Sequence, residues 1–320
     1  MNMIPVGISS CLLGNAVRYD GRHKGAQFDA TLVRHAFHWQ PICPEVASGM
    51  PVPRPTLGLY QHGNSVRLRE NDSQRDHTDS MVAFCNDFVT APPTIFGFVC
   101  MERSPSCGFR TTPYHSANGE HLSSNENGVF AHAIEKHFPL LPLANAQDLG
   151  TPLGCETFVN RVSVWHRWCT TVHNQCAAQR LIQFHSRVKF LALAHSQAHY
   201  RQLGPMVAGV TDRTAKERAA DYMHTLMDEL KRTPTTNDYV NALQHLAGMV
   251  KRSLSDPDKQ ILHRAIHSYE TGELPLQHPF AALRQSAKST GNAYVLQQMV
   301  LSPIPNVSDA IRDQLFKDSP

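Results

Sequence analysis

Short apolar runs and amphipathic stretches alternate along the first half of the chain. The apolar runs are of strand length and occupy residues 4–10, 37–42, 94–101 and 139–143. Helical spacing of apolar positions marks residues 28–38, 76–89 and 127–137. This alternation predicts a Rossmann-like α/β domain with a parallel sheet over residues 1–150.

Three segments interrupt that alternation. Prolines at positions 51, 53 and 55 exclude a helix there and predict an extended loop. Residues 57–71 alternate weakly, which is typical of a hairpin or an edge strand. Residues 111–126 are polar and rich in turn formers, so we expect a loop.

The second half changes to helical periodicity without a convincing strand. The predicted helices cover residues 158–178, 180–203, 215–231, 236–253, 257–271 and 279–285. Gly204-Pro205 and Gly272 are expected to stop helices, while Thr235 and Ser255 are expected to cap helix N-termini. The pattern predicts an all-α domain over residues 151–320, with a boundary near residues 145–154.

Composition excludes several classes of protein. The 320 residues are 41% hydrophobic and 18% charged, which is typical of a folded globular chain. No apolar run is long enough to cross a bilayer, and the first residues lack the features of a secretory signal. Eight cysteines are too few for a secreted disulfide scaffold, so we expect a reducing, cytoplasmic compartment and no membrane partner.

Charge is divided unevenly between the two halves. Residues 1–160 carry 11 Lys and Arg against 14 Asp and Glu, whereas residues 161–320 carry 19 against 13, a net charge of +6. The basic half indicates either a nucleic-acid-binding module or an ordinary solvated helical surface. In the first half, Arg18, Arg22 and Lys24 lie on a polar loop that could bind an anion or simply face solvent.

Three cysteines occupy equivalent positions, each where a short apolar run gives way to a loop. Cys11 follows residues 4–8, Cys43 follows residues 37–42, and Cys107 follows residues 94–101. Parallel strands present their carboxyl ends at one edge of the sheet, where ligands bind. We therefore expect the three thiols to lie together and to hold an iron–sulfur cluster.

Such clusters are usually held by four cysteine thiolates. Three cysteine ligands would therefore leave one iron open to a substrate atom. Glu45 lies two residues after Cys43, and Ser104 and Ser106 lie just before Cys107. A carboxylate can act as a general base, and a hydroxyl can bond a substrate carbonyl. The spacing of the cysteines matches no compact metal motif, so ordinary buried thiols are the alternative interpretation.

Other catalytic or metal signatures are weak. His195 with His199, and His263 with His267, are spaced four residues apart as zinc ligands can be, but no third ligand accompanies either pair. A solvated face or satisfied buried histidines are therefore the favoured interpretation. The chain contains no Gly-x-Ser-x-Gly, Gly-x-Gly-x-x-Gly or Walker motif.

The cysteine motifs, read together, resemble the thiouracil desulfidase family. They are VGISSCLLG at residues 6–14, VRYDG at 17–21, CPE at 43–45, PRP at 53–55 and RSPSCG at 103–108, and the likeness covers residues 4–145. The resemblance implies a 4Fe–4S cluster on Cys11, Cys43 and Cys107, whose open iron takes sulfur from a thiolated pyrimidine without redox turnover. It also implies catalytic roles for Glu45 and Ser104.

The second half resembles a helical domain often fused to that module, through residues 180–196 and 200–204. The fused form resembles desulfidases that remove sulfur from 4-thiouridine in transfer RNA, and the positive charge of this half suits that partner. We expect phosphate contacts from Arg180, Arg187 and Lys189. Arg180 and Arg187 share a helical face, while Lys189 is turned about 160° from Arg187.

Two other interpretations stay open. In one, the enzyme desulfurates free thiolated bases such as 2-thiouracil, and the helical half serves oligomerisation. In the other, the protein is a non-catalytic sensor that holds a cluster and binds RNA.

Overall fold

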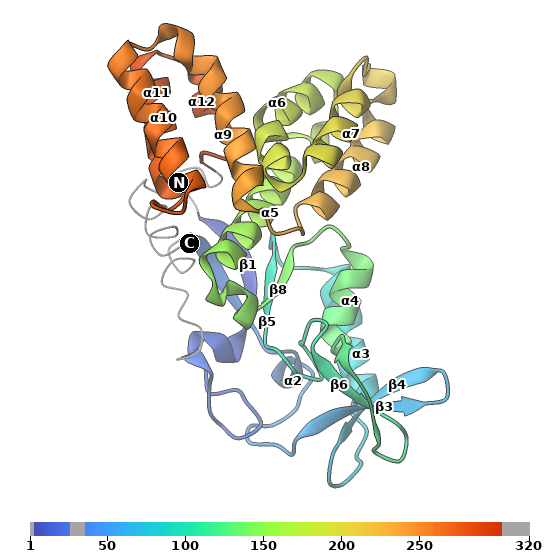
Figure 1. Cartoon of the computed structure of the whole chain (residues 1–320). Helices are drawn as coiled ribbons and strands as arrows, with labels where there is room; N and C mark the ends of the chain where they lie inside the picture. The colour runs from blue at the N-terminus through green and yellow to red at the C-terminus, as the bar shows by residue number, and fades with distance from the viewer. Residues whose placement is uncertain (1–2, 26–35, 303–320) are drawn as a thin grey trace. The chain divides into compact units, whose positions relative to one another are not determined.

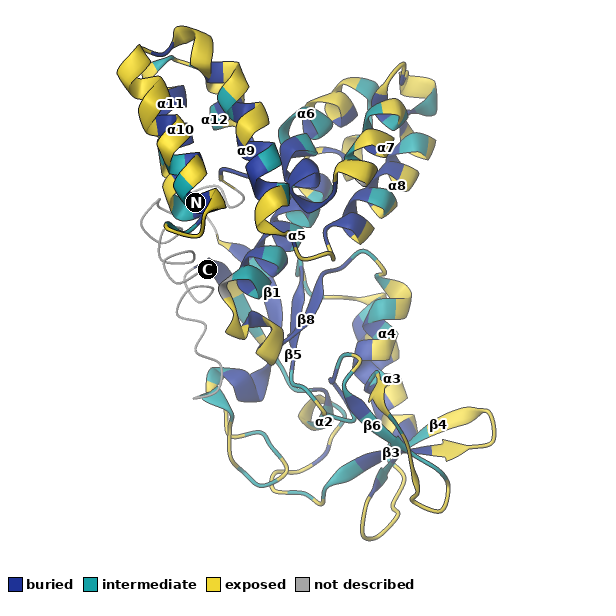
Figure 2. Cartoon of the chain, in the orientation of Figure 1, coloured by how far each residue is buried: buried dark blue, intermediate teal, exposed yellow. Residues whose placement is uncertain are grey.

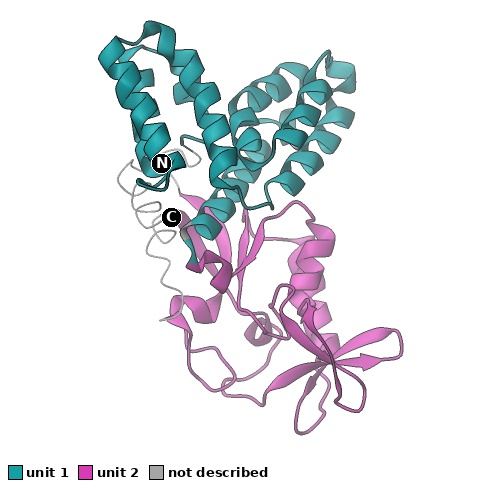
Figure 3. Cartoon of the chain, in the orientation of Figure 1, with its two compact units in different colours: residues 1, 151–320 teal, residues 2–150 magenta. Residues whose placement is uncertain are grey.

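A computed structural model of the whole chain describes residues 3–25 and 36–302 (Figure 1). The chain divides into two compact units, residues 2–150 and residues 151–320 (Figure 3). The predicted helix at residues 28–38 falls mostly outside the described residues. Its last two residues, Phe37 and His38, belong to a strand instead.

A four-stranded parallel sheet forms the core of the first unit. Its strands are β1 (Ile4–Ser9), β2 (Phe37–Ile42), β5 (Phe98–Cys100) and β8 (Leu143–Asn145), in the spatial order β2-β1-β5-β8. All three pairings are parallel, which confirms the predicted fold class. Because the chain moves to opposite sides of β1 to add β2 and β5, the topological switch point lies between β1 and β5.

Two helices, α3 (Thr78–Thr90) and α4 (Val129–His137), pack against each other beside this sheet. Phe130 on α4 stands edge-on to Phe98 of β5 at 5.5 Å and to Phe88 of α3 at 4.9 Å. Phe98 and Phe130 are completely buried. Figure 2 shows that α4 carries both buried and exposed residues, as expected of a helix with one face against the core. This aromatic cluster fixes α4 against the strand that leads to Cys107.

A second sheet, in the order β4-β3-β6-β7, was only partly predicted. Strands β3 (Leu57–His62) and β4 (Ser65–Glu70) form the predicted hairpin. Strands β6 (Thr112–His115) and β7 (His121–Glu126) occupy the segment expected to be a loop, so that expectation was wrong. Every β7 residue except Ser123 is exposed, so the strand lacks the one-sided apolar alternation that would have revealed it.

Two core strands differ from their predicted ranges. One is shorter than its apolar run, and the other begins later. In the run at 94–101 only β5 is a regular strand, although the Phe96 amide and the Gly97 carbonyl already bond to β1. The run at 139–143 was placed too early, since β8 begins at Leu143. Pro139 and Pro142 cannot donate a ladder hydrogen bond, which explains the late start.

The second unit is all-helical, as predicted. Its main helices are α5 (Pro152–Thr171), α6 (Ala178–His195), α7 (Gln197–Val207), α8 (Asp212–Glu229), α9 (Thr236–Val250), α10 (Asp256–Glu270), α11 (Gln277–Ser289) and α12 (Ala293–Leu296). Thr235 and Ser255 cap α9 and α10 as expected. Short α12 had not been predicted.

The expectation of one helix over residues 180–203 was wrong. Ser196 adopts an extended conformation and separates α6 from α7. Pro205, expected to stop a helix, lies inside the last turn of α7. None of the helices in the described ranges is both long and apolar enough to span a membrane.

Candidate active site

The three strand-end cysteines meet in one cavity of about 530 Å³. Cys11 lies in a short 3-10 helix, η1 (Ser10–Leu13), directly after β1. Cys43 precedes the short helix α2 (Pro44–Ala47) after β2, and Cys107 lies on the loop after β5. The cavity therefore opens at the carboxyl ends of three adjacent strands and at the switch point between β1 and β5.

The Cys107 loop is held rigidly by its own backbone and by α4. The Ser104 carbonyl accepts hydrogen bonds from the Gly108 amide at 2.9 Å and from the Thr112 hydroxyl at 3.0 Å. The Ser106 carbonyl accepts one from the Phe130 amide at 2.8 Å, in the first turn of α4. The loop thus presents Cys107 from a fixed frame.

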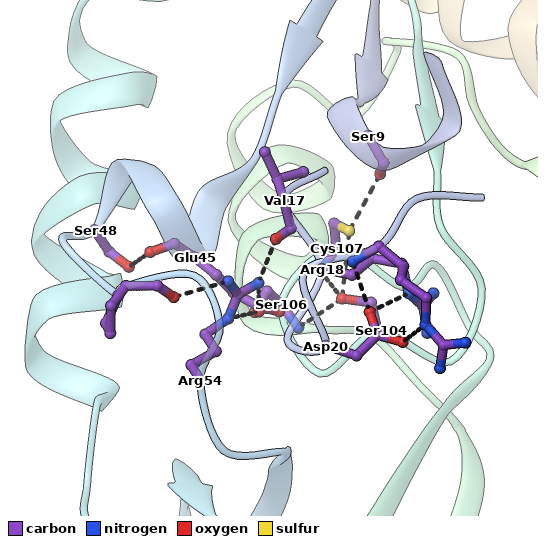
Figure 4. Close-up of polar contacts among 12 residues, drawn as sticks. Ser9, Val17, Arg18, Asp20, Glu45, Ser48, Arg54, Ser104, Ser106 and Cys107 are labelled. Atoms are coloured by element: carbon purple, nitrogen blue, oxygen red, sulfur yellow. Dashed lines mark hydrogen bonds and ion pairs between the residues drawn. The ribbon is translucent and has the colours of Figure 1, made fainter. Parts of the chain in front are cut away.

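Two hydroxyl groups contact the Cys107 sulfur directly (Figure 4). Ser9 Oγ donates to Cys107 Sγ at 3.1 Å and accepts from the Met101 amide at 2.9 Å. Ser104 Oγ lies 3.3 Å from the same sulfur and accepts from the amides of Ser106 and Cys107. Such contacts stabilise a thiolate more than a thiol.

Glu45 is oriented by an ion pair and by a hydroxyl group (Figure 4). Arg54 donates to Glu45 Oε2 through Nε at 2.7 Å and also pairs with it through Nη2. Ser106 Oγ donates to Glu45 Oε1 at 2.8 Å. The Arg54 and Glu45 side chains are only 5% and 13% exposed, so the pair is well shielded from competing water.

Arg54 also joins the polar loop after η1 to this carboxylate. Its Nη2 donates to the Val17 carbonyl at 2.9 Å, and its amide donates to the Tyr19 carbonyl at 2.9 Å. The proline-rich segment predicted to be extended therefore delivers the arginine that fixes Glu45.

The two serines of the Ser-Pro-Ser-Cys loop have different surroundings. Ser104 lines the cavity beside Cys107. Ser106 is completely buried, and its hydroxyl donates to Glu45 Oε1. Ser104 is thus the serine that can touch a molecule in the cavity, and Ser106 positions the carboxylate.

Burial controls the protonation of all three thiols. It raises the pKa of Cys11 to about 12, with the nearby Cys107 and Cys43 adding to the rise. It raises the pKa of Cys107 to about 11, although the Ser104 and Ser9 hydroxyls oppose the rise. Burial also raises the pKa of Cys43, opposed by the Val46 amide. Three neighbouring sulfurs that resist ionisation would ionise together only beside strongly positive charge.

The donor set suits a multi-iron cluster better than a single ion. Within the described ranges, no three His, Cys, Asp or Glu side chains are placed to hold one metal ion. A single zinc ion, for example, needs its sulfur ligands about 2.3 Å from one point. Cys11, Cys43 and Cys107 share a larger space without converging in that way, and soft thiolates are the usual ligands of iron–sulfur clusters.

The cavity also contains charged residues for which the sequence indicated no single role. Arg18 and Lys24 line the cavity, as one interpretation of that loop proposed, whereas the Arg22 side chain is 80% exposed and pairs with Asp20. Glu102 also lines the cavity, and its buried Oε2 has no hydrogen-bond partner. Its place two residues before the Ser-Pro-Ser-Cys motif was the available signal.

The remaining cysteines stay outside this site. Cys100 is completely buried within β5, and Cys85 is buried on α3. Cys155, Cys169 and Cys176 belong to the helical unit.

The predicted phosphate-binding residues of α6 have different surroundings. Arg180 Nη1 donates to the Thr171 carbonyl at 3.0 Å. The Lys189 ammonium lies over the rings of Phe190 and Tyr294, 5.1 and 5.6 Å from their centroids. Arg187 is half-buried, and its positive charge adds to the burial that lowers the pKa of Arg167.

His263 and His267 belong to no metal site among the residues that the structure describes, and the side chain of His199 lies outside them. His195 is completely buried and donates from Nδ1 to the Arg232 carbonyl at 2.7 Å. The His263 and His267 rings lie nearly parallel, with centroids 6.4 Å apart.

A parallel α/β domain with three thiols, a fixed carboxylate and a serine around one cavity is the arrangement expected of an enzyme whose cofactor is held by cysteines. Residues 6–146 match the family model described as 2-thiouracil desulfurase, and residues 189–305 match a protein family of unknown function, DUF1722. The chain therefore joins a 2-thiouracil desulfurase domain to a DUF1722 domain. These matches confirm the resemblance to thiouracil desulfidases fused to a helical domain that the sequence motifs indicated.

Two individual proteins are similar to parts of the chain. The uncharacterized protein YbgA of Escherichia coli (strain K12) is 30% identical over 128 residues, which are 40% of this chain and 76% of YbgA. The solved structure of a 4Fe–4S-dependent thiouracil desulfidase, TudS, is 28% identical and covers 47% of this chain and 94% of its own, with a TM-score of 0.35.

Proposed function

We propose that the protein is an iron–sulfur-dependent desulfidase that removes sulfur from 4-thiouridine in transfer RNA and releases sulfide. The observation that carries the proposal is the shared cavity of Cys11, Cys43 and Cys107, with Glu45 held beside them by Arg54 and Ser106. The family to which residues 6–146 belong supports the reaction class.

The three thiolates would hold a 4Fe–4S cluster, which when bound supplies a Lewis-acidic iron for a soft sulfur atom. The overall reaction exchanges a C=S group and water for a C=O group and hydrogen sulfide, so it needs no oxidant or reductant. It requires a base for the water and an acid for the departing sulfur.

Residues of this chain account for both proton transfers. Glu45 takes a proton from the attacking water as a general base. Hydrogen bonds to both of its carboxylate oxygens hold it in a fixed orientation for this role. Ser104 orients the substrate base from the cavity wall. Glu102, the second carboxyl that lines the cavity, would deliver a proton to the departing sulfur.

The transfer RNA part of the proposal is supported by the charge of the helical half and by its likeness to domains fused to such desulfidases. Residues 161–320 carry a net charge of +6, the sign that attracts a phosphate backbone. RNA-modifying enzymes commonly act on a base taken out of its stack, which would bring one thiolated base to the cavity.

The test is anaerobic incubation of the cluster-loaded protein with bulk transfer RNA that contains 4-thiouridine, followed by nucleoside mass spectrometry. Free 2-thiouracil is assayed in parallel. Loss of 4-thiouridine with sulfide release supports the proposal. Turnover of the free base alone would show that the protein is a desulfidase but that transfer RNA is not its substrate. RNA binding with an intact cluster and no sulfide release would indicate a sensor.

A further inference from the structure

A cavity of about 640 Å³ lies between α9 and α10 in the helical unit. One wall comes from the last turns of α9, including Gly248, and continues to Lys251 in the 3-10 turn that follows. A Cβ added at Gly248 would meet no atom within 4 Å, so this wall borders open space. The other wall is one face of α10, where Lys259, His263 and His267 recur every four residues.

The polar lining of this α9–α10 groove is predominantly basic. Lys251, Lys259 and Arg264 face a single carboxylate, Glu270. In the part of the chain that the structure describes, Lys251 and Arg264 make no ion pair, whereas Lys259 pairs with the 86% exposed Asp256. Unpaired cations around a concavity attract an anion more effectively than cations already neutralised by acidic neighbours.

The floor of the groove is apolar. Leu262 and Ile266 are 3% and 6% exposed, and Ala247 closes the α9 side. The near-parallel rings of His263 and His267 stand along the α10 rim. A positively charged groove with flat rings beside an apolar floor is how proteins hold a sugar-phosphate backbone and stack its bases.

We infer that the α9–α10 groove binds the RNA backbone of the substrate, with phosphates at Lys251 and Arg264 and an unpaired base against the His263 and His267 rings. This inference rests on the proposed function and moves the RNA contacts from α6 to the groove. The successive cations and imidazoles of α10 are about 6 Å apart along the helix, since four residues rise about 1.5 Å each. They can therefore follow a strand over several nucleotides.

The experiment compares two double charge reversals in the full-length, cluster-loaded protein. Lys251→Glu with Arg264→Glu changes the groove, and Arg213→Glu with Lys216→Glu makes the same change on exposed positions of α8, outside the groove. Binding of an unmodified transfer RNA transcript is followed by fluorescence anisotropy at several salt concentrations, and turnover of free 2-thiouracil is measured alongside. Circular dichroism checks that each variant is folded.

We expect the groove variant to bind the transcript at least about 30-fold more weakly, with a shallower salt dependence, while the α8 variant changes less than about 3-fold. Both variants should turn over 2-thiouracil at the wild-type rate. Equal weakening by both variants would overturn the inference, because it would show attraction by overall charge alone.

The outcomes separate this inference from the proposed reaction. If the wild-type protein desulfurates transfer RNA and the groove variant does so equally well, the reaction stands and the groove assignment is wrong. If the groove variant loses RNA binding but the wild-type protein releases no sulfide from RNA, the groove stands and the reaction is wrong. A wild-type protein that does not bind the transcript overturns both.

Discussion

At the scale of single residues, the site depends on a carboxylate whose two oxygens are both occupied by fixed donors. Arg54 binds one oxygen of Glu45 and Ser106 binds the other. Such an arrangement gives up rotational freedom in advance, so little reorganisation is needed when a proton moves. Glu102 contrasts with it, because its buried Oε2 has no such donor.

Replacement of Glu45 by Gln should lower kcat for desulfuration by about 10²- to 10⁴-fold, the usual contribution of a general base. Gln keeps the size of the side chain and the substitution changes no cysteine, so the cluster should load normally. Sulfide release and the visible absorbance of the cluster are measured on the same samples. An undiminished rate with a full cluster would remove Glu45 from the mechanism.

The matched substitution in the same cavity is Glu102→Gln. We expect a smaller loss in kcat, about 10-fold, because departure of the sulfur can draw a proton from solvent when Glu102 cannot supply it. A rise in KM with unchanged kcat would instead show that Glu102 binds the substrate and transfers no proton.

The sequence predicted the shared placement of the cysteines, because each follows a strand of one parallel sheet. It could not predict the partners of Glu45, since Arg54 reaches it from a loop whose path depends on tertiary structure. It also could not separate Ser104 from Ser106, because neighbouring loop residues point in directions that only the fold determines.

At the scale of elements, the Cys107 loop and the start of α4 form one tightly packed support. Gly128 precedes α4, and a Cβ there would lie 2.5 Å from both the carbonyl carbon and the carbonyl oxygen of Ser106. Gly128 amide also donates to the Gly108 carbonyl at 2.8 Å. Both atoms that a side chain would strike belong to the backbone, so the loop itself would have to move.

Gly128→Ala should therefore destabilise the first unit by about 2 kcal/mol, in the range for overpacked interiors, and should impair cluster loading by displacing Cys107. Urea unfolding and iron content per chain measure the two effects. The control is Gly204→Ala in α7, where an added Cβ meets nothing within 4 Å. That change should leave the cluster intact and stabilise the protein slightly, since Ala favours helix over Gly. Equal iron content in both variants would contradict the argument.

Elements were predictable where one face is buried and the other is exposed. The helical periodicity located α8, α9 and α10 to within a few residues, with the capping residues of α9 and α10 correct. It joined α6 to α7, because the break at Ser196 interrupts no apolar stripe and involves neither Gly nor Pro. Exposed strand β7 gave no pattern to detect.

At the scale of the whole molecule, the helical unit carries a sensitivity to acid. Burial lowers the pKa of His195 to about 4, and the pKa of His185 likewise, with the Lys189 charge adding to the effect on His185. In the unfolded chain a histidine titrates near 6.5. Between these values the unfolded state binds protons that the folded state does not, so stability is unchanged above about pH 6.5 and falls as the pH decreases toward 4.

For completely buried His195 the loss should approach about 1.4 kcal/mol per pH unit below its unfolded pKa. Urea unfolding of the protein at pH 7, 6 and 5, followed by circular dichroism, measures this slope. His195→Gln retains a donor for the Arg232 carbonyl but cannot take up a proton, so its slope should be shallower by about one proton. An identical slope in the variant would show that other groups govern acid sensitivity.

The uneven charge of the two halves makes a final prediction about substrates. Transfer RNA is a polyanion whose binding releases counterions, whereas 2-thiouracil carries no phosphate. If about three phosphates contact the protein, raising salt from about 50 to about 200 mM should lower kcat/KM for thiolated transfer RNA roughly 40-fold, because each contact contributes a slope of about 0.9. The kcat/KM for 2-thiouracil should change less than about 2-fold, because this substrate carries no phosphate to bind the protein.

Steady-state rates of sulfide release at four salt concentrations measure the salt dependence of kcat/KM for both substrates. Equal salt dependence for the two substrates would show that salt acts on the cavity itself, and that the positive charge of residues 161–320 does not recruit RNA.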